Sequence, residues 1–241
     1  MAGFIDLHSH WVAGVDDGAP SVEHGVALLA ALRSIGFDTV VATPHMRPGM
    51  FNTDRESLET AYAAMGDAIA AAPGMPKVML SAEHYFDEIV FARLMNGEAL
   101  PYPGGKSVLV EFSSNQFPAR LNDRMFDLQR KGLRPVIAHP ERYLPVWKHP
   151  ESMVELVERG NVLLLDVGAL VGKYGRAPRK AAEELIELGL YYAACSDAHR
   201  VSDVDAVLAG ITALRELVGE EEAQFLLHDG PQAILEGKVD L

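Results

Sequence analysis

Residues 4–18, FIDLHSHWVAGVDDG, join an apolar strand-like run to a cluster of metal-binding residue types. Asp6, His8 and His10 alternate, so in an extended chain their side chains project from the same face. Imidazoles and carboxylates that converge on one face are costly to desolvate, and groups of like charge there repel one another. A bound cation would remove both penalties. The stretch therefore predicts a strand that leads into a metal site.

Short apolar runs alternate with longer amphipathic patterns along the rest of the chain. We expect strands at Phe4–His8, Thr39–Thr43, Lys77–Glu83, Ser107–Phe112, Pro135–His139, Val162–Val167 and Tyr191–Ser196. We expect helices at Val22–Ile35, Arg55–Ala72, Leu121–Lys131, Glu151–Glu158, Arg179–Leu188 and Asp203–Val218. Expected helix caps are Ser21 and Asp54 at N-termini, and Gly36, Gly132, Gly160 and Gly189 after C-termini.

Repeated βα units predict an α/β protein with parallel strands, and seven such units favour a closed, TIM-like barrel. An open doubly wound sheet is the alternative, but the chain lacks its G-x-G-x-x-G fingerprint. No Pro/Ser-rich linker, low-complexity tract or charge run divides the sequence. We therefore expect a single domain over residues 1–241.

Composition narrows the class of protein. The 241 residues are 49% hydrophobic, enough for a substantial core, and the net charge of −13 disfavours nonspecific binding to nucleic acid or anionic lipid. No apolar run is long enough for a membrane span, and Asp6 leaves no room for an apolar leader. Cys195 is the single cysteine, which excludes an intrachain disulfide and fits a reducing compartment. We expect a cytoplasmic protein.

Polar residues stand at the ends of most expected strands. The candidate metal ligands are His8, His10, His45, Glu83, Glu111, His139, Asp197 and His199, with Asp16 and Asp17 in the loop after the first strand. In a parallel barrel these strand ends share one rim, where active sites lie. Imidazole and carboxylate ligands without thiolate suit Mn, Fe or Zn. The set is too large for one tetrahedral zinc and suffices for two or three ions if Glu83 bridges.

Each candidate also has a simpler structural interpretation. A lone histidine at a strand end is more often a hydrogen-bonded structural residue than a ligand, so the prediction depends on the joint position of the set. Glu111 lies in an apolar run, where an unpaired carboxylate is rarely buried. His84 follows Glu83 and should point the other way, so we interpret it as structural or supporting. His24, His149 and His228 are expected at the surface.

Closely spaced metal ions clamp phosphate oxygens and lower the pKa of bound water. The residues therefore predict hydrolysis of a phosphate ester by in-line attack of a metal-held hydroxide, without a phosphoenzyme. Arg142, three residues beyond His139, is either a bidentate phosphate ligand or an ordinary solvent-facing arginine. Arg47 and Arg200 flank two ligand motifs and are further candidates for phosphate binding.

The motifs DLHSH, TPH, AEH, EF, AHPER and SDAH, in this order, resemble those of the polymerase and histidinol phosphatase (PHP) superfamily. Within it, HSHWVAGVDDGAPS, TPHMRPGMFN and VIAHPERY are most similar to the manganese-dependent bacterial tyrosine phosphatases of capsule and exopolysaccharide synthesis. The resemblance covers nearly the whole chain. It implies a distorted (β/α)7 barrel with a trinuclear metal centre, and a phosphotyrosine protein as substrate, for example an autophosphorylating bacterial tyrosine kinase.

The resemblance also implies roles for single residues. His8, His10, Glu83 and Asp197 would hold one ion, Glu83, Glu111 and His139 a second, and Asp17, His45 and His199 a third, with Asp16 in the loop or in a supporting position. Arg142 would bind the substrate phosphate, and Asp197 or His199 would assist proton transfer to the leaving tyrosinate. The chain departs from the pattern in two places. Only Arg200 is available as a further arginine after SDAH, and Asp166 replaces an amide.

Three other functions compete. A cysteine-dependent phosphatase needs C-x5-R, whereas CSDAHR offers C-x4-R without glycine, so Cys195 is better interpreted as a small core residue. A PHP phosphatase could act on a small ester such as histidinol phosphate with the same metal chemistry. A non-catalytic, metal-bound module could dock on a partner, although the intact ligand set argues against it.

Overall fold

The computed structural model describes residues 3–51 and 53–240. Its strand pairs are all parallel, as the βα alternation predicts. The strands are β1 (Phe4–Ser9), β2 (Phe37–Ala42), β3 (His45–Met46), β4 (Lys77–Leu80), β5 (Glu83–Tyr85), β6 (Ser107–Glu111), β7 (Arg134–Ala138), β8 (Val162–Asp166) and β9 (Tyr191–Cys195). They form one sheet of order β1-β2-β4 and another of order β3-β5-β6-β7-β8-β9.

Breaks between β2 and β3 and between β4 and β5 distort the barrel. The strand predicted at Thr39–Thr43 ends at Ala42 and resumes as β3, and the one predicted at Lys77–Glu83 divides into β4 and β5. Pro44 lies in the first break, where it has no N–H for a sheet ladder. The strand predicted at Thr39–Thr43 is therefore confirmed as β2, which ends one residue earlier, whereas the prediction of one continuous strand at Lys77–Glu83 was wrong.

Backbone hydrogen bonds join the two sheets. The Ser81 N–H donates to the Ala42 carbonyl (2.8 Å) and the Glu83 N–H donates to the Pro44 carbonyl (3.1 Å), so that pairing continues from β2 and β4 past the breaks into β3 and β5. On the other side, the His10 N–H donates to the Ala198 carbonyl (2.9 Å), and the Asp197 N–H donates to the His8 carbonyl (3.0 Å). The first strand is thereby bonded to the segment that follows the last one, as in the distorted seven-unit barrel that the sequence predicts.

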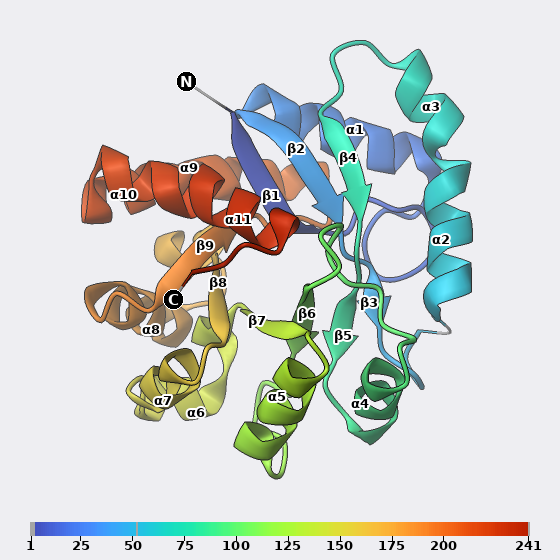
Figure 1. Cartoon of the computed structure of the whole chain (residues 1–241). Coiled ribbons are helices and arrows are strands. Elements are labelled where there is room, and N and C mark those ends of the chain that lie inside the picture. The colour runs from blue at the N-terminus through green and yellow to red at the C-terminus, as the bar shows by residue number, and fades with distance from the viewer. Residues whose placement is uncertain (1–2, 52, 241) are drawn as a thin grey trace.

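Helices surround the strands in chain order (Figure 1). They are α1 (Val22–Ser34), α2 (Arg55–Ala64), α3 (Gly66–Ala71), α4 (Glu88–Met95), α5 (Leu121–Arg130), α6 (Leu144–Lys148), α7 (Ser152–Glu158), α8 (Arg176–Glu187), α9 (Val204–Val218), α10 (Glu220–Gln224) and α11 (Gly230–Glu236). The helix expected at Arg55–Ala72 is divided into α2 and α3, and the sequence analysis missed α4, α6, α10 and α11. No helix within residues 3–51 and 53–240 is long and apolar enough to cross a bilayer.

The predicted caps are confirmed with one exception. Asp54 caps α2, since its carboxylate accepts the Ser57 N–H (2.9 Å), while the Ser21 side chain makes no cap bond to α1 and its hydroxyl donates to Glu23 instead. The four glycines expected after helices all have positive φ. Local sequence thus indicates where α2 begins and where α1, α5, α7 and α8 end.

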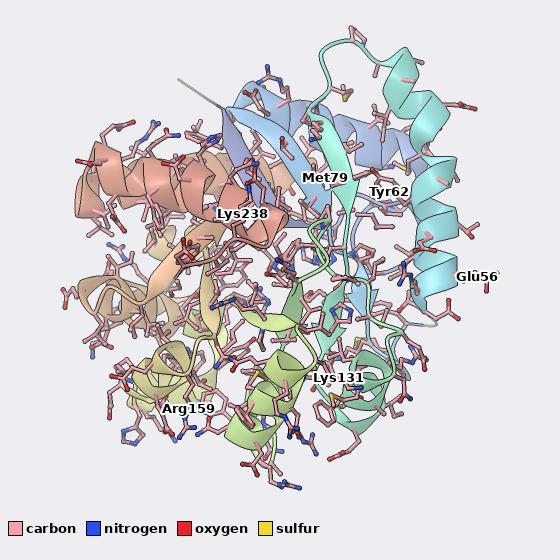
Figure 2. The ribbon with its side chains drawn as sticks, in the orientation of Figure 1. Glu56, Tyr62, Met79, Lys131, Arg159 and Lys238 are labelled. Carbon is pink, nitrogen blue, oxygen red and sulfur yellow. The ribbon has the colours of Figure 1, made fainter. Side chains whose placement is uncertain are left out.

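Strand side chains alternate between two apolar layers. Leu163 and Leu165 pack outward against the helices, whereas Val162 and Leu164 pack into the barrel interior with Cys195. Charged side chains such as Glu56, Lys131 and Arg159 point outward from the helical layer (Figure 2). The apolar interior leaves the carboxyl ends of the strands as the place where buried polar side chains collect.

Candidate metal centre

Side chains from separate strand ends meet at this rim in one contiguous cluster. It contains all nine predicted ligands, His8, His10, Asp17, His45, Glu83, Glu111, His139, Asp197 and His199. Their ligand atoms form four overlapping groups, each within 4.8 Å. Five imidazoles and four carboxylates, with no thiolate among them, make a donor set suited to borderline divalent ions.

Glu83 is the hub of the cluster. Its carboxylate lies 3.3 Å from His8 Nε2, 3.5 Å from His10 Nε2, 2.9 Å from His45 Nδ1 and 3.1 Å from His139 Nε2. Burial opposes ionisation of Glu83, but the surrounding imidazoles outweigh it and hold its pKa well below the usual range. One carboxylate therefore faces four potential ligand histidines, as a bridging ligand must.

Asp197 completes the inner part of the cluster. Its Oδ1 lies 3.3 Å from His8 Nε2 and 3.5 Å from His10 Nε2, and its Oδ2 accepts a hydrogen bond from Arg142. Asp197 and His139 both have positive φ, at 42° and 33°. Non-glycine residues rarely adopt this conformation, which costs about 1–3 kcal/mol and recurs at functional sites.

Solvent exposure differs strongly between members of the cluster. His8, His10, Glu83, His139 and Asp197 are buried, whereas the Asp17 side chain is 58% exposed and that of His199 is 23% exposed. Asp17 Oδ1 lies 3.5 Å from His45 Nε2 and 3.6 Å from His199 Nε2. A cavity of about 600 Å³ adjoins this exposed side, lined by Asp16, Asp17, Gly18, Pro20, His24, His199, Arg200, Val201 and Ser202. This cavity gives access to the cluster beside Asp17 and His199.

The surroundings of Glu111 indicate whether a cation fits the cluster. Burial and the nearby Glu83 carboxylate raise the pKa of Glu111 to about 7. Its buried Oε2 has no hydrogen-bond partner among the described residues and lies 3.9 Å from His45 Nδ1. Two buried carboxylates close together and an unpartnered carboxylate oxygen are costly without a positive charge between them. The residues present therefore fit divalent ions.

The geometry groups the ligands differently from the division that the resemblance implies. Glu111 lies with His45 and Glu83, while His139 lies with His8 and Glu83. His10 belongs both to the group with His8 and Asp197 and to the group with Asp17, His45 and His199. Glu83 is shared between groups in both descriptions, which agrees with a bridging position.

Asp16 is not one of the nine predicted ligands, but it contacts two of the ligand histidines. Its Oδ2 lies 2.8 Å from His10 Nδ1 and accepts the His45 N–H (3.0 Å), and its Oδ1 accepts the Gly18 N–H (2.9 Å). Gly18 is needed there because an added Cβ would lie 2.0 Å from the His10 carbonyl oxygen. In the DDG sequence, Asp16 therefore orients His10, whereas Asp17 lies at the exposed side of the cluster.

Asp6 shares a strand face with His8 and His10, as the alternation predicts, but serves a different purpose. Its carboxylate accepts hydrogen bonds from the Ser196 N–H (3.0 Å) and hydroxyl (2.5 Å). Burial raises its pKa to about 6. Asp6 therefore connects β1 to the segment that carries Asp197.

The three candidate phosphate-binding arginines differ in position. Arg142 is partly exposed, at 30% of its side chain, and it pairs with Asp197 and lies over the Tyr174 ring, with Cζ 4.5 Å from the ring centroid. Arg47 lies over Tyr85 at 3.9 Å and close enough to Glu111 to lower its pKa. Arg200 is exposed and lines the cavity.

The remaining histidines and the cysteine lie outside the cluster. The His84 ring lies 2.8 Å from the Leu109 carbonyl and accepts the Leu100 N–H, a structural role as predicted. His24 and His149 are exposed, and His228 is half-buried beside the Gly3 carbonyl. Cys195 is buried with its thiol on the Leu165 carbonyl, and burial raises its pKa well above the usual range. It is a core residue, as predicted.

Sequence reasoning missed a second polar group beside the cluster. The Glu141 carboxylate is buried, accepts the Asp166 N–H (2.9 Å) and the Tyr191 hydroxyl (2.8 Å), and has its pKa raised to about 8 by burial and by Asp166. Tyr174 was also missed. The only signal for this group in the sequence was a pair of acidic residues, Glu141 in HPER and Asp166 at the end of β8.

Comparisons with known proteins agree over the whole chain. Residues 4–236 match the family model described as "Capsular polysaccharide synthesis, CpsB/CapC". Tyrosine-protein phosphatase YwqE of Bacillus subtilis is 29% identical over 197 residues, covering 82% of this chain and 78% of that protein. Tyrosine-protein phosphatase CpsB of Streptococcus pneumoniae is 27% identical over 237 residues, covering 96% and 98%.

The fold is also similar to a solved one. A chain from the crystal structures of YwqE and CpsB, described as unique metal-dependent tyrosine phosphatases, superposes with a TM-score of 0.90 at 26% identity. The match covers 98% of this chain and 96% of that chain. Similarity therefore extends through every strand that contributes to the cluster.

Proposed function

The chain belongs to the CpsB/CapC family of capsular polysaccharide synthesis, and from this we propose that it is a metal-dependent protein-tyrosine phosphatase. The observation that carries the proposal is the convergence of five histidines and four carboxylates, from separate strand ends, on one partly open cluster. Similarity over the whole chain to named tyrosine phosphatases favours phosphotyrosine over a small phosphate ester.

We propose that two or three divalent ions bind the cluster, with manganese preferred over iron or zinc. The ligands would be His8, His10, Asp17, His45, Glu83, Glu111, His139, Asp197 and His199, with Glu83 shared between ions. When bound, closely spaced ions would supply an acidified water and neutralise charge on phosphoryl oxygens.

The side chains around the cluster would bind and orient the substrate. Arg142 presents a planar guanidinium beside Asp197, suited to a bidentate contact with phosphate oxygens. Arg47 and Arg200 add positive charge on two other sides, which favours an anionic substrate despite the net charge of −13. We propose that Asp197 or His199, with Oδ1 and Nδ1 3.7 Å apart, assists proton transfer to the leaving tyrosinate.

We propose an autophosphorylating bacterial tyrosine kinase as a physiological substrate and the cytoplasm as the location. The kinase is what the family resemblance of the motifs implies, and the names of the relatives, which are tyrosine phosphatases in a capsule-synthesis family, support a phosphotyrosine protein as substrate. The location agrees with the single, buried cysteine, since a reducing compartment imposes no need for disulfides.

The test combines metal analysis of purified protein with kinetics after manganese loading. We expect bound divalent metal and a higher kcat/KM on a phosphotyrosine peptide than on histidinol phosphate. A preference for histidinol phosphate would transfer the chain to the small-ester phosphatases. Filled metal sites without hydrolysis of either substrate would favour a non-catalytic docking module. Trapping of a covalent phosphoenzyme would contradict direct hydrolysis.

A further inference from the structure

The Arg142 guanidinium is held between an acid and an aromatic ring. On one side it pairs with Asp197, and on the other its Cζ lies 4.5 Å from the centroid of the Tyr174 ring. Asp197 is also a proposed metal ligand, so its charge is shared with the metal cluster. Of these two partners of Arg142, the Tyr174 ring is therefore the one that is not a proposed metal ligand.

Tyr174 is itself fixed in a tight turn after β8. The turn is bounded by Gly172 and Gly175, with φ of 78° and 98°, and closed by the Gly175 N–H on the Gly172 carbonyl (2.9 Å). Burial and the nearby Asp166 carboxylate raise the pKa of the Tyr174 hydroxyl, which places this hydroxyl beside the residue at the end of β8. The side chain is half-buried, so the turn presents a preset ring face to the rim of the site.

The same turn also contacts the segment that follows His199. Lys173 Nζ lies 3.8 Å from Asp203 Oδ1, and the other oxygen of Asp203 accepts the His199 N–H (2.9 Å) and the Arg200 N–H (3.0 Å). The turn that carries Lys173 and Tyr174 thus contacts Arg142 through the Tyr174 ring, and it contacts the segment after His199 through Lys173.

We propose that Tyr174 is a positioning residue that holds the Arg142 guanidinium with its N–H groups directed at the substrate phosphate. The inference rests on the proposed phosphatase function. A ring face supports a planar guanidinium through the cation–π interaction without using its N–H donors, which stay free for a bidentate contact. A second acidic partner would instead occupy those donors and lower the positive charge offered to phosphate.

The test replaces Tyr174 with Phe, which keeps the ring, and with Leu, which keeps apolar bulk but has no ring face. We expect Tyr174→Phe to stay within about twofold of wild type and Tyr174→Leu to lower kcat/KM on a phosphotyrosine peptide about tenfold. We expect most of the loss in KM, with an equal rise in the inhibition constant of inorganic phosphate. Bound metal and melting temperature should stay at wild-type values. Tyr192→Ala is the control for the loss of a half-buried ring, because Tyr192 lies at the N-terminal end of β9, opposite the end that leads to Asp197.

A double-mutant cycle decides whether Tyr174 acts through Arg142. In an Arg142→Ala background, Tyr174→Leu should have no further effect. Wild-type kinetics for Tyr174→Leu, or an undiminished loss in the Arg142→Ala background, would overturn the proposal. Calorimetric binding of inorganic phosphate to metal-loaded protein gives the same comparison without turnover. It therefore tests Tyr174 even if the phosphotyrosine assay refutes the proposed function.

Discussion

Replacing Asp16 with Asn should weaken metal binding although Asp16 is not a proposed ligand. One oxygen of Asp16 faces His10 Nδ1 and the His45 N–H, and the other accepts the Gly18 N–H. Burial opposes its charge, but His10 and the backbone donors lower its pKa to about 2, so the side chain is ionised. It turns His10 so that Nε2 faces Glu83 and Asp197. An amide cannot accept hydrogen bonds on both sides and provides no charge for the imidazole.

Removal of the carboxylate partner of a ligating histidine costs about 10- to 100-fold in metal affinity. That range corresponds to about 1.4–2.8 kcal/mol of binding free energy. In saturating metal the same amount is lost from the free energy of unfolding, because the ion binds the folded chain. For a chain of this size the melting temperature of the loaded protein should fall by about 3–11 °C.

The assay is competition with a chelator of known affinity, together with melting curves of the metal-free and loaded proteins. Asp38→Asn is the matched control, because Asp38 is an exposed carboxylate paired with Arg33 at the surface. We expect the loaded Asp16→Asn protein to lose more stability than the metal-free one. Unchanged metal affinity, or equal losses in the two forms, would refute the supporting role that we infer for Asp16.

Three further changes test other parts of the interpretation. Glu111→Gln should lower bound metal and activity together, by at least about tenfold in kcat/KM, and an enzyme with unchanged activity would remove Glu111 from the site. Cys195→Ala should retain activity within about twofold, because the thiol is a buried core group; inactivation would revive a cysteine-dependent mechanism. Asp54→Ala should lower the free energy of unfolding by about 1 kcal/mol through loss of the α2 cap, as denaturant melts would report, with kcat unaffected. An Asp54→Ala protein as stable as wild type would show that the cap contributes nothing in this fold.

Features of short range could be predicted from the sequence. The alternation of Asp6, His8 and His10 placed these residues on one strand face, and the parallel-strand argument placed Glu83, Glu111 and the other strand-end residues on one rim. Asp54 as a cap and the positive φ of glycines after helices followed from local backbone preferences. In the strand and cap cases the relevant geometry is set by the residue and its near neighbours, since strand period and cap conformation repeat in every fold. The common rim followed instead from the parallel direction of the predicted strands.

The individual contacts between distant segments could not be predicted from the sequence. The hydrogen bonds of Asp16 and the placement of Arg142 between Asp197 and Tyr174 depend on how several elements pack together. The long helical pattern at residues 55–72 likewise became two helices only in the packed chain. The sequence by itself determined which chemical groups stand at the strand ends. The tertiary structure decided which groups meet and at what distance, because compensation of buried charge is a property of neighbours in space.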